Sequence, residues 1–309
     1  MNALRVIMIA CHLLLVQQVV TAEEGPMPSL VDPAWLEPRL QQPDLVVLDI
    51  RSPIGGADRN AYEAGHIPDA VYSNFVTDDW HDQRTRVPAT LPSIAQLEAL
   101  LGRLGIGNDS RVVIVHSGTD SADFSTAARV FWTLRLLGHD RMAILDGGFR
   151  AWEAAGLPVE QGWNAPERAT FTASVRETLL ASMDEVTAAM ERGAQLVDAR
   201  PRNQYTGASK MPIAPRAGTL PDAINLEHPR LIDADGRLVG PGDLTAILRD
   251  IGLDQERETV TFCNIGHVSA GAWFALSELA GFRNVSLYDG SIAQWAASPD
   301  RPMVVLTDR

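Results

Sequence analysis

Residues 259–281 read TVTFCNIGHVSAGAWFALSELAG, and this stretch decides the fold. It begins with a β-branched and aromatic run, 259–262, that is typical of a buried strand. The loop that follows begins at Cys263 and ends at Val268. Apolar residues such as Trp273 and Leu276 then recur at helical spacing as far as Gly281, a residue type that commonly ends a helix. The stretch therefore predicts a strand, a short loop and a helix in direct succession.

The same order occurs in the first half of the chain. Residues 111–138 read RVVIVHSGTDSADFSTAARVFWTLRLLG, in which a β-branched strand leads through a polar loop into a predicted helix over 126–137. A short strand ending in Asp-x-Arg, at Asp49 or at Asp198, precedes each copy. A period of about 145 residues indicates a duplicated domain. Strands that alternate with helices predict an α/β fold of two tandem domains, each a central parallel sheet flanked by helices.

A polar stretch separates the two copies. Residues 161–173 contain Gly162 and Pro166 and show neither helical nor strand periodicity, as is usual for a linker. We therefore predict an N-terminal domain over 23–160, which lacks a cysteine, a linker over 161–173, and a C-terminal domain over 174–309 that carries Cys263.

Residues 1–22 have the features of a secretory signal peptide. Arg5 precedes a mostly apolar run, and small residues stand before a cleavage site after Ala22. The run is too short and too interrupted for a membrane span, so the mature protein is expected in the periplasm or outside the cell. Cleavage also removes Cys11, which leaves Cys263 as the single cysteine of the mature chain. One cysteine cannot form an internal disulfide.

The composition excludes several classes of protein. The chain has 26 Lys+Arg against 39 Asp+Glu, a formal net charge of -13, and 46% hydrophobic residues, as in a globular protein. An acidic surface repels phosphate, so no nucleic-acid partner is expected. The single lysine, Lys210, follows Ser209 instead of Gly, which excludes a P-loop. No pair of His or Cys has metal-ligand spacing, so neither a metal nor a cofactor is expected. The histidines that we expect at the surface or as capping groups are His66, His81, His116, His139 and His228.

Cys263 lies where a parallel sheet usually binds its ligand, beyond the carboxyl end of a strand. Gly266 allows the loop to curl so that successive backbone N–H groups point at the sulfur. The positive end of the following helix adds to their field. Both effects favour an anion, so we predict that Cys263 is a nucleophilic thiolate. His267 is expected to point from this loop into solvent.

These features together resemble the two-domain rhodaneses, a family of sulfurtransferases, over essentially the whole mature chain. In that family the C-terminal domain carries the cysteine and the N-terminal domain has lost it. Here His116-Ser117 and a longer loop take the corresponding place in the first domain. The matching motifs are the pairs Asp49/Arg51 and Asp198/Arg200, the sequence Gly65-His66-Ile67-Pro68, the sequence Leu145-Asp146-Gly147-Gly148 with Trp152, and the loop Cys263 to Val268 followed by Ser269-Ala270.

The resemblance implies a two-step sulfur transfer. The Cys263 thiolate would take the outer sulfur of a small-molecule donor such as thiosulfate and become a persulfide, and an acceptor such as cyanide or a thiol would then remove that sulfur. The acceptor could also be a protein. The residues that would surround the transferred sulfur in the loop are Asn264, Ile265, Gly266, His267, Val268 and Ser269.

Two positions depart from the thiosulfate enzymes of the family, which usually carry an Arg and a Lys where this chain has Gln204 and Ile265. Other cations would then have to hold an anionic donor, although Arg200 is also a natural structural partner for Asp198. The candidates for substrate contacts are Gln204 itself with Arg200 and Arg202, and beyond these Lys210, Arg216 and His267.

The same departures leave alternatives open. One is a 3-mercaptopyruvate sulfurtransferase, although the loop lacks the Cys-Gly-Ser/Thr-Gly form typical of those enzymes. Another is a non-enzymatic persulfide carrier that serves an exported partner enzyme. A cysteine-dependent phosphatase is disfavoured, because its loop is one residue longer and ends in an Arg where this chain has Ser269.

Overall fold

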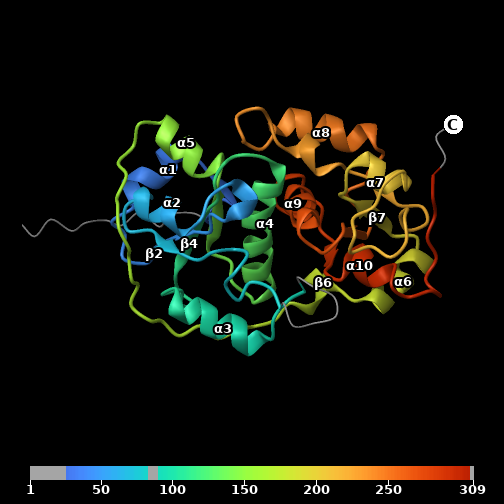
Figure 1. Ribbon diagram of the computed structural model, residues 1–309, viewed down its shortest axis with the longest axis horizontal. Coiled ribbons are helices and arrows are strands. Elements are labelled where there is room, and N and C mark those ends of the chain that lie inside the picture. The colour runs from blue at the N-terminus through green and yellow to red at the C-terminus, as the bar shows by residue number, and fades with distance from the viewer. Residues whose placement is uncertain (1–25, 83–89, 307–309) are drawn as a thin grey trace, which may run out of the picture.

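A computed structural model describes residues 26–82 and 90–306 of the chain. The expected signal peptide at 1–22, with its cleavage site, lies outside the described residues. Within them the chain forms two similar α/β halves that lie side by side (Figure 1).

The first half contains a five-stranded, fully parallel sheet with the order β1-β5-β4-β2-β3. Its strands are β1 (Leu30–Val31), β2 (Leu45–Asp49), β3 (Val71–Tyr72), β4 (Arg111–Val115) and β5 (Met142–Leu145). Its helices are α1 (Pro33–Leu36), α2 (Arg59–Ala64), α3 (Ile94–Arg103), α4 (Ser121–Leu136) and α5 (Gly148–Ala154), with short 3-10 turns η1 (Glu37–Arg39) and η2 (Pro53–Gly55).

The second half repeats this sheet with the order β6-β10-β9-β7-β8, so that each strand has a counterpart in the same position. Its strands are β6 (Leu180–Ala181), β7 (Gln195–Asp198), β8 (Ile224–Asn225), β9 (Thr259–Phe262) and β10 (Val285–Tyr288). Its helices are α6 (Met183–Glu191), α7 (Arg202–Thr206), α8 (Pro241–Asp250), α9 (Val268–Phe274) and α10 (Ser291–Trp295), with 3-10 turns η3 (Glu177–Leu179) and η4 (His228–Leu231). The predicted fold class, two tandem domains each with a central parallel sheet, is confirmed.

Two helix boundaries differ from the sequence expectation. The helix predicted over 126–137 begins earlier, at Ser121, because the side chain of Asp120 caps it by accepting the N–H groups of Ala122 and Asp123. The helix predicted to continue to Gly281 is α-helical only to Phe274 and then widens into a π-helical turn, η5 (Ala275–Leu279).

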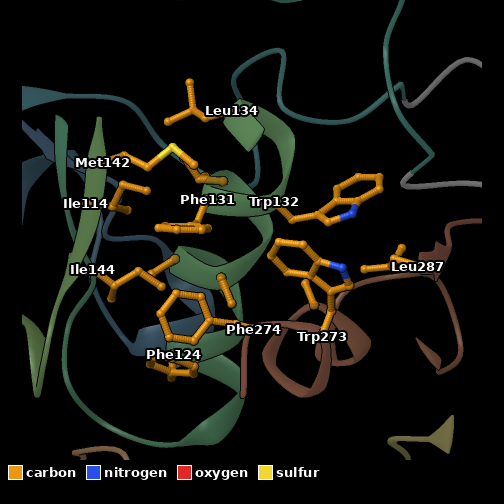
Figure 2. Close-up of a cluster of buried hydrophobic side chains, with 14 of the residues drawn as sticks. Ile114, Phe124, Phe131, Trp132, Leu134, Met142, Ile144, Trp273, Phe274 and Leu287 are labelled. Atoms are coloured by element: carbon orange, nitrogen blue, oxygen red, sulfur yellow. The ribbon is translucent and has the colours of Figure 1, made fainter. Parts of the chain in front are cut away.

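The two halves share a continuous hydrophobic core. Helices α4 and α9 lie side by side between the two sheets (Figure 1). Phe124 and Phe131 of α4 meet the ring of Phe274 of α9 edge to face, with centroid distances of 5.7 and 4.9 Å. Figure 2 shows these rings and Trp273 between strands of the first sheet and Leu287 of the second. Each domain therefore completes the burial of the other.

The outer face of each sheet has a smaller core of its own, with one tryptophan in each. Trp152 of α5 donates its indole N–H to the carbonyl of Pro158, and Trp295 of α10 does the same to Pro302, both at 2.8 Å. Both side chains are fully buried. Trp132 and Trp273 are fully buried as well, in the core that the two halves share.

Residues 161–173 contain no helix or strand and run along the first half. Ala169 donates its N–H to Gly102 of α3, and Phe171 is buried in the shared core. This stretch therefore contributes to packing as well as joining the two halves.

Three histidines that were expected at the surface or at caps are instead buried. His66, His116 and His139 are 0%, 0% and 3% exposed. His66 stacks on Tyr62 with its Nδ1 2.9 Å from that residue's carbonyl, and His116 pairs with Asp123 at 2.9 Å. His66 and His116 therefore each have an internal polar partner for Nδ1, which the sequence pattern alone does not reveal.

Candidate active site

Cys263 directly follows β9 and is 1% exposed. Its Sγ lies 3.4 Å from the hydroxyl of Ser269, in the first turn of α9, which begins at Val268. The sulfur therefore sits between the carboxyl end of a central strand and the N-terminal turn of a helix, as the sequence predicts. It is also the only cysteine among the described residues.

Gly266 gives the loop its curl. Its φ of +77° lies in the left-handed region that favours glycine. A Cβ at this position would come within 2.7 Å of Asp289 Oδ1 and 2.9 Å of Arg129 Nη1, closer than real Cβ contacts. Both the backbone angle and the lack of space therefore require glycine here.

The loop amides divide into two groups, which refines the expectation that all of them point at the sulfur. The hydroxyl oxygen of Ser291 accepts the N–H groups of Cys263 and Gly266, each at 3.1 Å, and donates to the carbonyl of Tyr288 at 2.7 Å. Ser291 itself has a positive φ of 47°, a costly conformation for a non-glycine residue. Within residues 26–82 and 90–306, no group accepts from the amides of four loop residues, namely Asn264, Ile265, His267 and Val268.

Gln204 lies against the loop, but its contact is with the protein itself. Its Oε1 accepts the side-chain N–H of Asn264 at 2.8 Å, and the sulfur of Met211 lies 3.1 Å from the same nitrogen. Met211 and Ile213 are exposed on the segment that follows α7. Sequence reasoning missed Met211, because nothing in the spacing relates residue 211 to the cysteine loop.

Most of the candidate cations for an anionic donor are engaged elsewhere. Arg200 is 1% exposed, and its guanidinium donates to the carboxylate of Asp198 and to the carbonyl of Gly218. These contacts are those of a structural partner of Asp198, within the second domain. Lys210 donates to the carbonyl of Ala214 at 2.8 Å.

Arg216 and Arg202 differ in whether their guanidinium groups contact other parts of the chain. Arg216 donates to four backbone carbonyls near the C-terminal end of the chain, those of Trp295, Ala296, Ser298 and Arg301. Arg202, at the first position of α7, is exposed, and its guanidinium has no partner within the described part of the chain. Arg202 is thus the candidate whose charge remains available.

His267 does not point into solvent, which corrects the sequence expectation. Its ring packs on Phe75 of the first domain at a centroid distance of 5.5 Å, and its Nε2 is buried with no hydrogen-bond partner among the described residues. Burial, with the nearby charge of Arg129, lowers the pKa of His267 to about 4. The ring is therefore neutral at neutral pH and supplies no positive charge to a donor. The approach of the first domain, invisible in the loop sequence, causes this burial.

Arg129 is a further residue at the site that sequence reasoning missed. It comes from α4 of the first domain and is 1% exposed. Its Nη1 donates to the carbonyl of Gly266 at 3.1 Å, and its Nη2 lies 2.6 Å from Asp289 Oδ1. The available signal was an arginine inside the apolar run 127–132 of that helix, a residue type that is almost never fully buried unless paired.

The corresponding loop of the first domain holds a carboxylate of its own. It follows β4, the counterpart of β9, and Asp123 accepts N–H groups from Gly118, Thr119 and Ser117 at 2.7, 3.1 and 3.3 Å. Burial opposes this charge, but His116 and the amides hold the pKa of Asp123 below its usual value. The loop of the first domain thus already binds an anion, the carboxylate of Asp123.

Other kinds of site are not evident near the loop. A cavity of about 870 Å³ lies between α8 and the edge of the first sheet, but its lining contains no residue of the Cys263 loop. Across residues 26–82 and 90–306, no group of three or more His, Cys, Asp or Glu could hold a metal ion. None of the helices in these residues is long and apolar enough to cross a membrane.

Comparison with known proteins agrees with the duplicated architecture. The rhodanese-like domain model matches the chain twice, at residues 32–155 and 182–298. The chain is 32% identical to the thiosulfate sulfurtransferase of Mus musculus over 280 residues, covering 86% of this chain and 91% of that protein. The thiosulfate sulfurtransferase of Rattus norvegicus is 31% identical with the same coverage. A 3-mercaptopyruvate sulfotransferase structure from Escherichia coli superposes with a TM-score of 0.74 at 26% identity, covering 86% of this chain and 99% of that one.

Proposed function

This chain belongs to the rhodanese family, and we propose that it is a sulfurtransferase that moves a sulfane sulfur from a donor such as thiosulfate to a thiophilic acceptor through a persulfide on Cys263. The observation that carries the proposal is the position of the thiol. It lies at the entry to α9, in a loop where the N–H groups of Ile265, His267 and Val268 donate to no other group among the described residues.

The two steps balance without a cofactor. The Cys263 thiolate attacks the outer sulfur of thiosulfate, a sulfur–sulfur bond forms, and sulfite leaves with the electron pair of the broken bond. A thiolate or cyanide then attacks the outer sulfur of the persulfide, which returns the Cys263 thiolate. The amides of Ile265, His267 and Val268 are the groups that would stabilise the negative sulfur in both steps.

The donor contacts are part of the same proposal. The loop residues 264–269 surround the outer sulfur, and Arg202 offers its charge to an anionic donor. Gln204 acts indirectly, because its bond to Asn264 fixes one side of the loop. The resemblance to the Escherichia coli enzyme keeps 3-mercaptopyruvate as an alternative donor.

The domain limits and the cellular location also remain proposals. The two family matches and the linker-like segment between the sheets support units at 23–160 and 174–309. A signal peptide cleaved after Ala22 would place the enzyme in the periplasm or outside the cell, where a protein could serve as the sulfur acceptor. N-terminal sequencing of the exported protein tests this location. A product that begins at Met1 would contradict it.

Intact mass after incubation with thiosulfate tests the mechanism. We expect the mature protein to gain one sulfur atom and Cys263→Ser to gain none. The mechanism is wrong if the wild type gains no sulfur or if Cys263→Ser still gains one. Steady-state turnover with a panel of donors, including thiosulfate, 3-mercaptopyruvate, thiosulfonates and glutathione persulfide, then separates an enzyme from a carrier. A carrier would load once and turn over slowly with all of them.

A further inference from the structure

The catalytic loop is held from the first domain by one buried cation. Arg129 lies in the middle of α4, and its side chain is 1% exposed. A guanidinium cannot be deprotonated to escape burial, so it must be paired where it stands. Its partners are the carbonyl of Gly266, inside the Cys263 loop, and the carboxylate of Asp289, both in the second domain.

These partners connect directly to the geometry of the loop. Asp289 follows β10 and is two residues ahead of Ser291, whose hydroxyl accepts the N–H groups of Cys263 and Gly266. Its second oxygen accepts the N–H of Leu91, so that the first domain holds this carboxylate at both oxygens. The closeness of Arg129 and Asp289 to the position of a Gly266 Cβ shows how tightly they enclose this part of the loop.

The flat face of the Arg129 guanidinium also contacts a neighbour, in addition to the contacts of its terminal nitrogens. Its guanidinium carbon lies 4.6 Å from the ring centroid of Trp132, one turn further along α4. The backbone of α4, the ring of Trp132 and the carboxylate of Asp289 together hold the guanidinium in its orientation. A rigid group that donates to the Gly266 carbonyl fixes the direction of the peptide between Gly266 and His267, and hence the direction of the His267 amide.

We propose that Arg129 is a positioning residue for the Cys263 loop, supplied by the domain that has no cysteine. It holds Gly266 and Asp289 in place, and with them the direction of the loop amides that have no acceptor among the described residues. This inference rests on the sulfur-transfer function proposed above. It assigns the first domain a part in the reaction and does not make Arg129 a catalytic residue, since it touches the loop and not the reacting atoms.

Arg135 provides a matched control on the same helix. It also crosses the domain interface, pairing with Glu278 at 2.9 Å, and it also pairs with Asp140. It makes no contact with the Cys263 loop among the described residues. Arg129→Met and Arg135→Met therefore each remove an interdomain ion pair from α4, but only the first releases the loop.

The first readout is the pH dependence of Cys263 alkylation by iodoacetamide. In Arg129→Met the Asp289 carboxylate loses its cationic partner beside the loop, and the loop amides lose their alignment. Both changes disfavour the thiolate form of Cys263. The pH midpoint of alkylation should rise by about half a unit or more, while Arg135→Met keeps the wild-type midpoint. Equal profiles for Arg129→Met and wild type would overturn the proposal, as would an equal shift in Arg135→Met.

The second readout is sulfur transfer from thiosulfate by the full chain. We expect Arg129→Met to lose about tenfold to a hundredfold in kcat with a smaller change in KM, since misplaced groups cost rate more than binding. Arg129→Lys, which keeps the charge but cannot hold both partners in one plane, should recover the fold and only part of the rate. Full recovery of rate by Lys would contradict the positioning role.

The two experiments also separate this inference from the function it rests on. If the wild type fails to take up sulfur, the proposed function fails, but the alkylation profile still decides whether Arg129 controls the loop. If Arg129→Met does not fold, as judged by circular dichroism, the profile and rate of Arg129→Lys decide in its place. A Lys variant with wild-type behaviour in both assays overturns the proposal.

Discussion

Acidification should weaken the fold through His267, and the structure gives the size of the effect. The ring is neutral and packed between the domains, with a pKa of about 4, against 6.5 for an ordinary histidine. Between these values the unfolded chain binds a proton that the folded chain does not, so stability falls as the pH falls from 6.5 towards 4. At pH 5 the loss is about 2 kcal/mol, and partial exposure of the ring reduces it to about 1–2 kcal/mol.

Urea denaturation at pH 7.5, 6 and 5 measures this loss. His267→Gln has no titrating ring, so its stability relative to the wild type should rise by about 1–2 kcal/mol between pH 7.5 and pH 5. Other groups cancel in this comparison, because they titrate equally in both proteins. The groups that face the ring, Arg129, His228 and Asp123, remain in the variant. A difference between the two proteins that does not change with pH would refute the assignment of a buried, neutral His267.

Three further changes test other parts of the structure. Gly266→Ala places a Cβ 2.7 Å from an oxygen of Asp289 and holds alanine at a left-handed backbone angle, which costs roughly 1–3 kcal/mol. Sulfur loading, followed by intact mass, should slow at least about tenfold while the circular dichroism spectrum stays unchanged. Phe274→Ala should lower the free energy of unfolding in urea by about 3–5 kcal/mol, whereas the exposed Leu279→Ala should change it by less than about 1 kcal/mol. Gln204→Arg should lower the KM for thiosulfate about fivefold, because the new positive charge attracts the dianion. It should also lower kcat, because the hydrogen bond between residue 204 and Asn264 is lost. An unchanged KM would mean that another group binds the donor.

The architecture was largely predictable because it is encoded locally and twice. The β-branched runs that became β4 and β9, and the helices that follow them, are visible as periodicity within single segments. The repeat then predicted two similar domains but no strand order, which the structure shows to be the same in both sheets. What the sequence pattern did not reveal were the π-helical turn after Phe274 and the burial of His116 beside Asp123.

The site was predictable only where one segment contains it. Cys263, Gly266 and the helix entry belong to a single stretch, and they lie as expected. Arg129 and Met211 reach the loop across distances of 137 and 53 residues, so no spacing rule could place them there. The orientation of His267 failed for the same reason, because the surface that covers it belongs to the other domain.

The loop after β4 in the first domain and the loop after β9 in the second occupy equivalent places, because the domain is duplicated. Both follow the central strand of a parallel sheet; the amides of the first contact a carboxylate, and several amides of the second have no acceptor among the described residues. In the first domain Asp123 occupies that position permanently, so this loop has no vacancy for a sulfur donor. Two turns further along the same helix, Arg129 projects into the second domain and grips the Gly266 carbonyl. Helix α4 thus supplies both the carboxylate of Asp123, which fills the loop of the first domain, and Arg129, which contacts the Cys263 loop of the second. Asp123→Ala, which removes this carboxylate, should still leave the first domain without sulfur loading, because its loop also lacks a cysteine.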